Sequence, residues 1–275
     1  MEFTINDKYL HCYQLFTCSN SQIKRGKEKL QYKTDIKHPV ELGRPKGWEF
    51  CLSENKLKFP KAIYLNQKEP LAIALHSFAN HELLAMELFA WAILTFHDYP
   101  FLHGIWYQTL LEEQSHFNLY IDRIEQLGFS FGDFPLNSFF FRTVTKSNSP
   151  QEFISLMNLS FEQANLDHAL YYRDIFAKFG DNESAQIMQT ILEDEILHIK
   201  RSIPFMQKKS SEEHQDFWAY YLNNLKKTNI TPARAKGIHF NYSARVDANL
   251  PSDFIQNVKE YNDNFASTSR KEWKQ

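Results

Sequence analysis

The feature that most constrains the fold is a repeated pattern of glutamate and histidine within long segments of helical periodicity. Glu113 and His116 form one Glu-x-x-His pair, and Glu195 and His198 form a second. Three residues advance an α-helix by about 4.5 Å and about 300°, so each pair projects from one face and can bind one ion. A single pair means little because both residue types are common on solvated surfaces. The repeat gives the pattern its weight.

A glutamate upstream of each pair completes two similar sets. In the first predicted hairpin, Glu82 lies about 17 residues before the turn at Tyr99, and Glu113 to His116 lie about 14 to 17 residues after it. In the second, Glu162 lies about 18 residues before its turn, and the second pair lies about 15 to 18 residues after it. Residues equally far from the turn face each other because both arms rise about 1.5 Å per residue. Each hairpin thus delivers two glutamates and one histidine.

Hydrophobic periodicity predicts an all-α fold. Apolar residues recur at three-to-four spacing from Pro70 onward, and proline is favoured in the first turn of a helix. Gly128 and Gly180 are typical of helix ends, and the segment 149–152 (Ser-Pro-Gln-Glu) matches a capping box. The predicted long helices run from Pro70 to a connection at 97–100, from about 101 to 127, from the capping box to 179, and from Asp181 to about 208, with a kink at Pro204.

Outside these helices the pattern is weaker. Residues 1–68 are polar and irregular, and we expect a wrapping arm that precedes a four-helix bundle over 69–208. The connection 129–148 is rich in phenylalanine and is expected to pack those rings into the core. For 209–275 we expect a fifth helix at 212–226 and then a mostly irregular tail, packed on the bundle.

Both sets of predicted ligand residues lie among apolar neighbours, which argues against the alternative that the carboxylates are solvated. Buried carboxylates repel one another unless a multivalent cation neutralises them. Ferritin-like bundles hold two metal ions with one glutamate from each of two helices and Glu-x-x-His from each of two others. The sequence therefore predicts two bound metal ions. We expect both to be iron, with a Mn/Fe pair as the alternative. The predicted ligands are Glu82, Glu113, His116, Glu162, Glu195 and His198.

Several neighbours of the predicted ligands have open roles. Glu112 and Asp194 lie four residues before a ligand histidine, where a carboxylate can accept the second imidazole proton, and a solvated position is the alternative. Glu87 lies about 140° around the helix from Glu82 and is expected to face away. Four further side chains are candidates to border the site, although packing or a surface position is the simpler expectation for each: His76, His81, His168 and Tyr120.

Composition limits the classes of partner and the compartment. The net charge of −2 and pI of 6.6 provide no general positive field for nucleic acid or an anionic membrane. No stretch approaches the roughly 20 apolar residues that cross a bilayer, and no secretory signal is recognisable at the start. Cys12, Cys18 and Cys51 form no C-x-x-C pair, so we expect reduced thiols in the cytoplasm.

Several blocks of the sequence also occur together in a known superfamily. They are His81–Leu83 with Ala85, Glu112–His116, Leu127–Gly128, Phe131–Pro135, Glu162, Asp194–His198 and Phe240–Arg245. In these blocks the chain resembles a bacterial branch of the ferritin-like diiron-carboxylate superfamily that is catalogued as a domain of unknown function. The resemblance covers roughly residues 70–255 and implies the six-ligand site and a ferritin-like four-helix bundle with additional helices, but no particular reaction. A more distant likeness, limited to the ligand order, is to the diiron tRNA-adenosine hydroxylase.

The leading functional prediction is a non-haem diiron oxidoreductase that activates O2 to hydroxylate or oxidise an organic substrate. The six ligands would act through the metals, and a separate electron donor would supply reducing equivalents. The substrate is expected to be a small molecule or a modified nucleoside. No membrane partner is expected, and a homodimer is an open alternative.

Three other functions remain open at the level of sequence. One is an iron-binding or ferroxidase-type protein without an organic substrate, and another is a purely structural metal site. The third is a tRNA-nucleoside hydroxylase, for which a locally basic stretch offers contacts, although a solvated tail is the simpler interpretation. That stretch contains Lys226, Lys227, Arg234, Lys236 and Arg245.

Overall fold

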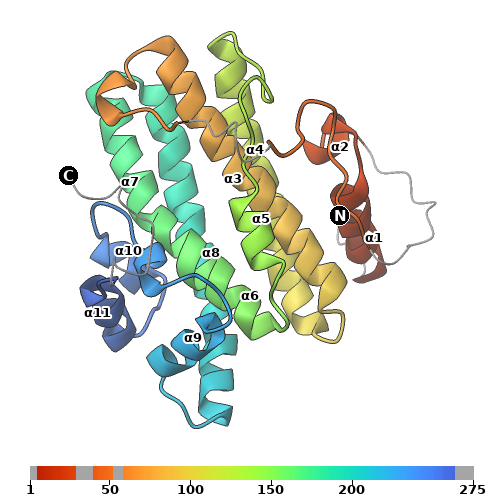
Figure 1. The fold of residues 1–275 in the computed structure, drawn as a ribbon, viewed down its shortest axis with the longest axis vertical. Helices are drawn as coiled ribbons and strands as arrows, with labels where there is room; N and C mark the ends of the chain where they lie inside the picture. The colour runs from red at the N-terminus through yellow and green to blue at the C-terminus, as the bar shows by residue number, and fades with distance from the viewer. Residues whose placement is uncertain (1–4, 29–39, 52–57, 264–275) are drawn as a thin grey trace. The chain divides into compact units, whose positions relative to one another are not determined.

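The computed structural model describes residues 5–28, 40–51 and 58–263, and the regular elements formed by these residues are helices (Figure 1). Within the described part there is no β-strand, only one isolated bridge between Phe50 and Leu136. The chain divides into two compact units. The first contains the described residues up to Pro150 together with Tyr172–Ile191, and the second contains Gln151–Tyr171 and the described residues from Leu192 onward.

The first unit is built on a long helical hairpin, as predicted. Helix α3 (Lys68–Thr95) and helix α4 (Pro100–Gln126) lie side by side and run in opposite directions (Figure 1). A proline stands at the start of α4, where its missing N–H costs no hydrogen bond. Gly128 follows with a φ of +74°, a left-handed conformation that glycine adopts without steric cost.

The predicted irregular arm contains regular structure. Helix α1 (Ile5–Thr17) packs on α3, and the short helix α2 (Ser21–Lys24) follows it; a 3-10 turn, η1 (Ala62–Tyr64), precedes α3. Cys12, Leu15 and Phe16 of α1 are buried. These apolar positions are separated by polar residues in a short segment, so the helical period was not evident in the sequence. Residues 29–39 and 52–57 of the arm lie outside the described part.

The connection after α4 is only partly in the core. It contains a short helix, α5 (Phe139–Val144), beside α3. Phe131 is buried and packs edge-on against Trp48 and Phe117. Phe139 is 38% exposed. The prediction that the phenylalanines of this connection enter the core therefore holds for Phe131 and is wrong for Phe139.

The predicted third helix is interrupted by a π-helical segment. It consists of α6 (Pro150–Leu156), the π-helix η2 (Met157–Glu162) and α7 (Gln163–Lys178). The fourth helix, α8 (Asn182–Glu212), begins as predicted, because the Asp181 side chain accepts a hydrogen bond from the Ser184 N–H at 3.0 Å. Helix α8 continues through Pro204, several residues beyond the predicted end.

The C-terminal part of the second unit is more helical than predicted. Helix α9 (Phe217–Leu225) begins five residues later than expected, where Asp216 accepts a hydrogen bond from the Ala219 N–H at 2.9 Å. The expected irregular tail instead forms three short elements. They are a 3-10 turn η3 (Pro232–Ala235), α10 (Tyr242–Asp247) and α11 (Ser252–Glu260).

A buried ion pair holds these short elements. Arg245 of α10 pairs with Asp167 of α7 at 2.6 Å, and both side chains are fully buried. Asp167 also accepts hydrogen bonds from the N–H groups of Gly237 and Asn241. Contacts between residues so far apart in the chain leave no local sequence period, so periodicity does not predict these short elements.

Among the described residues, no helix is both long and apolar enough to cross a lipid bilayer.

Candidate metal centre

The first unit brings together three of the predicted ligands. Glu82 lies on α3, and Glu113 and His116 lie on α4. Nδ1 of His116 is 3.7 Å from Oε2 of Glu82 and 3.4 Å from Oε2 of Glu113. All three residues are at least 96% buried, with 4%, 1% and 1% of their surface exposed. We call them triad A.

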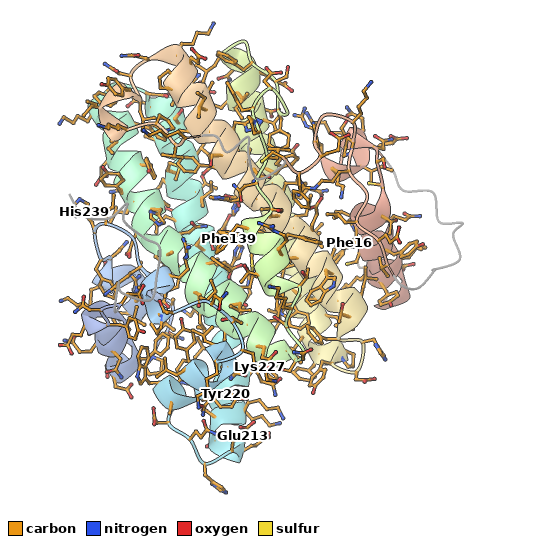
Figure 2. All side chains as sticks on the ribbon, viewed as in Figure 1. Phe16, Phe139, Glu213, Tyr220, Lys227 and His239 are labelled. Carbon is orange, nitrogen blue, oxygen red and sulfur yellow. The ribbon has the colours of Figure 1, made fainter. Side chains whose placement is uncertain are left out.

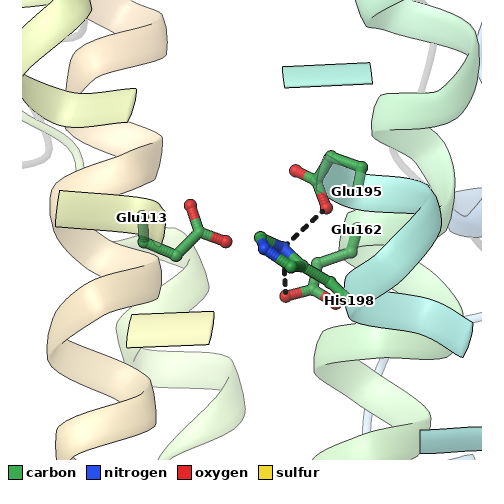
Figure 3. Close-up of side chains that lie close together, drawn as sticks. All are labelled: Glu113, Glu162, Glu195 and His198. Carbon is green, nitrogen blue, oxygen red and sulfur yellow. Dashed lines mark ion pairs between the residues drawn. The ribbon is translucent and has the colours of Figure 1, made fainter. Parts of the chain in front are cut away.

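The second unit brings together the other three. Glu162 is the last residue of the π-helix η2, and Glu195 and His198 lie on α8. Figure 3 shows the His198 imidazole between the two carboxylates, with Nδ1 at 3.8 Å from Oε1 of Glu162 and 3.5 Å from Oε2 of Glu195. Exposure is 2% for Glu162 and 1% for each of the others. We call them triad B.

The spacing within each triad suits a metal ion. Two ligand atoms bound about 2.1 Å from one ion lie about 3.0 to 3.6 Å apart for bond angles of about 90 to 120°. Of the four imidazole-to-carboxylate distances, 3.4 and 3.5 Å lie within this range, and 3.7 and 3.8 Å lie slightly beyond it. In each triad, one ligand atom per residue lies within 4.8 Å of the others. These buried groups could therefore each hold a metal ion.

The electrostatics of triad A also favour a cation. Burial and the neighbouring Glu113 carboxylate raise the pKa of Glu82 well above its usual value, and hydrogen bonding to His116 opposes this rise. Burial disfavours the charged form of a carboxyl group, and a second carboxylate adds repulsion. A bound cation would relieve both costs, because it stabilises the ionised carboxylates.

The π-helix determines where Glu162 lies. A π-turn contains one residue more than an α-turn, so it shifts the faces on which the following residues lie. Short π segments of this kind occur frequently at functional sites. Here the segment ends at Glu162, one of the predicted ligands, and the α-helical conformation resumes with Gln163 in α7. Helical periodicity predicted one continuous helix, because the sequence has no propensity signal for a π-turn.

Two asparagines at triad B were not predicted. Nδ2 of Asn158 donates to Oε2 of Glu162 at 2.6 Å, and Nδ2 of Asn165 donates to Oε1 of Glu195 at 2.8 Å. Asn158 is 2% exposed and Asn165 is half-buried. Only the spacing of Asn158, four residues before Glu162, could have indicated one of them. Asn165 contacts Glu195 on another helix, and no local sequence pattern reveals such a contact.

The structure bears differently on the three carboxylates that neighbour the predicted ligands. Glu112 is half-buried and accepts a hydrogen bond from Gln108 at 3.2 Å, and Asp194 is half-buried. Their proposed bonds to ligand histidines stay a prediction. Glu87 does face away from triad A. It is fully buried between Lys24, at 2.8 Å, and Arg44, at 2.6 Å.

The bordering side chains have packing contacts. Nε2 of His76 accepts a hydrogen bond from the Gly132 N–H at 2.9 Å, so this histidine supports the connection after α4. The His81 ring stacks on Phe140, and the His168 ring lies against Gly237. The Tyr120 hydroxyl donates to Sδ of Met188 at 3.2 Å, in agreement with the packing alternative.

The basic C-terminal residues make internal contacts. Lys227, labelled in Figure 2, pairs with Glu152 at 3.1 Å, and Nζ of Lys236 donates to the carbonyls of Lys259 and Tyr261. Arg245 is fully buried. Arg245 is therefore not available to a nucleic acid, and contacts of the other basic residues with nucleic acid stay a prediction.

Comparison with known proteins places the chain in one family. A family model described as "Protein of unknown function (DUF455)" matches residues 6–256, which include both triads. Neither the curated proteins nor the solved structures give a significant match. The match also covers most of the N-terminal segment before α3, which the sequence resemblance did not reach. Because the match spans most of its length, the chain belongs to the DUF455 family.

Proposed function

We propose that triads A and B together hold two iron ions in a ferritin-like arrangement, and that the protein is a non-haem diiron oxidoreductase that uses O2 to oxidise an organic substrate. The observation that carries the proposal is the pair of buried triads, each with two carboxylates and one imidazole. The order of the six residues along the chain is the one that ferritin-like diiron proteins use.

The donor set fits iron better than the main alternatives. Structural zinc sites are usually rich in cysteine, but the described cysteines Cys12, Cys18 and Cys51 do not belong to either triad. Calcium prefers six to eight oxygen ligands and no imidazole. Four carboxylates and two imidazoles carry a total charge of about −4 when ionised, which two ions of charge +2 would neutralise.

The chain's own residues define what such a centre would do. The two imidazoles project from the long helices α4 and α8, so they would keep the ions in place. The carboxylates can bind through one oxygen or two and would follow a change in ionic charge. Bound iron would supply redox chemistry with O2. The buried, largely apolar surroundings of the triads would keep bulk water away from a reactive oxidant.

Anaerobic loading followed by O2 tests this proposal. The metal-free full chain would be loaded with two equivalents of Fe(II), and O2 uptake would be followed with an oxygen electrode. We expect rapid O2 consumption, with at least tenfold slower uptake for Glu113→Ala and Glu195→Ala. Glu69→Gln, an exposed carboxylate on α3, is the matched control and should behave like the wild type.

Two results would contradict the proposal. Stoichiometric iron binding without O2 consumption would indicate a structural or storage role. Rapid iron oxidation that ends in released or mineralised Fe(III), whatever organic compounds are added, would indicate the metal-handling alternative.

A further inference from the structure

The two triads are supported differently. In triad B, each of the two carboxylates accepts a hydrogen bond from an asparagine amide. The two asparagines, Asn158 of η2 and Asn165 of α7, lie on one continuous helical stretch. Asn158 also donates to the main-chain carbonyl of His198, at 3.5 Å, which links it to the third member of the triad. In triad A, by contrast, the groups that interact with Glu82 among the described residues are the other two members of the triad: Oε2 of Glu82 lies 3.7 Å from Nδ1 of His116, and the neighbouring Glu113 carboxylate raises the pKa of Glu82.

The asparagines select which carboxylate oxygens face the imidazole. The amide of Asn158 occupies Oε2 of Glu162, and the other oxygen, Oε1, is the one that lies 3.8 Å from Nδ1 of His198. The amide of Asn165 occupies Oε1 of Glu195, and its other oxygen, Oε2, lies 3.5 Å from the same nitrogen. Each carboxylate thus keeps one oxygen directed at His198. These two hydrogen bonds hold each carboxylate in this orientation.

An amide is well suited to this task. It donates a hydrogen bond to a carboxylate but carries no charge, so it orients the ligand without competing with a cation. A lysine or arginine at the same place would neutralise the carboxylate and weaken metal binding. Partners of this kind typically change metal affinity by about 10- to 100-fold when they are removed. Preorganised ligands also lose less conformational freedom on binding.

We propose that Asn158 and Asn165 are positioning residues for triad B, and that they make triad B the metal position that fills first. Triad A, in which no amide among the described residues holds Glu82, binds the second ion more weakly. This inference rests on the proposed function only in assuming that both triads bind metal. It does not depend on the reaction.

Titration of the metal-free full chain with Co²⁺ tests the inference. Co²⁺ reports its ligand geometry by visible absorption, and isothermal calorimetry gives the affinity of each step. We expect two steps in the wild type. His198→Ala should remove the tighter step, and His116→Ala should remove the weaker one, which assigns each step to a triad.

The asparagine variants then give the decisive result. Asn158→Leu and Asn165→Leu should each weaken the tighter step at least tenfold and shift the absorption spectrum of the first equivalent, while the weaker step changes less than threefold. Asn224→Leu is the matched control, because this half-buried amide on α9 donates to the main-chain carbonyl of Tyr220, and it should leave both steps unchanged. Circular dichroism would verify folding, and Asn165, being half-buried, provides the milder of the two substitutions.

The possible failures are distinguishable. If the wild type binds no Co²⁺, the proposed function and this inference both fail. If it binds two ions and the asparagine variants leave the tighter step and its spectrum unchanged, only this inference fails. An effect confined to the weaker step would also overturn it, since that result would place the first ion at triad A.

Discussion

The buried carboxylates of this protein have two kinds of surroundings. The triad carboxylates are grouped with one another and with imidazoles, whereas Glu87 is fully compensated by Lys24 and Arg44. Glu87 and Glu82 lie on the same helix, five residues apart in the sequence. Glu87 attaches the N-terminal segment to α3 through these ion pairs, whereas Glu82 lies in triad A and is not paired with a lysine or arginine among the described residues.

Glu87→Gln tests this structural role. The substitution leaves the Lys24 ammonium buried with no full countercharge, so we expect the free energy of unfolding to fall by about 3 to 5 kcal/mol. Urea denaturation would measure the change. Glu69→Gln, on the exposed first turn of α3, should change stability by less than about 0.5 kcal/mol. A loss below about 1 kcal/mol for Glu87→Gln would show that the buried pairs do not stabilise the N-terminal segment.

A second residue-scale prediction concerns pH. Burial lowers the pKa of His76 to about 4, compared with about 6.5 in an unfolded chain. The unfolded state therefore binds a proton more readily, and the stability contributed by neutral His76 is lost as the pH falls from 6.5 towards 4. Between pH 7 and pH 5 the loss amounts to about 2 kcal/mol. In His76→Gln, unfolding free energies measured at both pH values should show a pH-dependent loss smaller by about this amount. An unchanged pH dependence would mean that His76 titrates normally in the folded protein.

At the scale of elements, the long helices were predictable and the short ones were not. Helices α3, α4 and α8 have many apolar positions at regular spacing and clear start or stop residues, such as Asp181 and Gly128. The short elements α10 and η3 depend on Arg245 and Asp167, which are distant in sequence. The candidate ligands were found because Glu-x-x-His recurs at matching positions. Asn165 was missed because its partner lies on another helix.

Two glycine substitutions should have opposite effects on their elements. A Cβ on Gly43 would lie 1.9 Å from the carbonyl oxygen of Thr17, at the end of α1, and main-chain atoms cannot move away cheaply. Gly43→Ala should therefore destabilise the protein by about 1 to 3 kcal/mol or more. Gly104 lies within α4 and a Cβ there meets nothing within 4 Å, so Gly104→Ala should stabilise by about 0.5 to 1 kcal/mol. Thermal or urea unfolding of both variants would check the signs, and equal effects would refute the close contact at Gly43.

At the scale of the whole molecule, each compact unit supplies one triad of the same composition. Helices α7 and α8 pass from one unit to the other, so the two units share continuous elements. A chain that buries four glutamates and two histidines in this way carries a large cost unless cations are present. Metal binding should therefore also stabilise the folded state, because an ion that binds only the folded chain raises its stability.

The most direct test of the central claim is the metal content per chain, measured by mass spectrometry after anaerobic loading with excess Fe(II) and removal of unbound iron. The wild type and Glu69→Gln should retain two ions, and His116→Ala and His198→Ala should each retain about one. Two full equivalents in both histidine variants, or none in the wild type, would contradict the assignment of the triads as metal ligands.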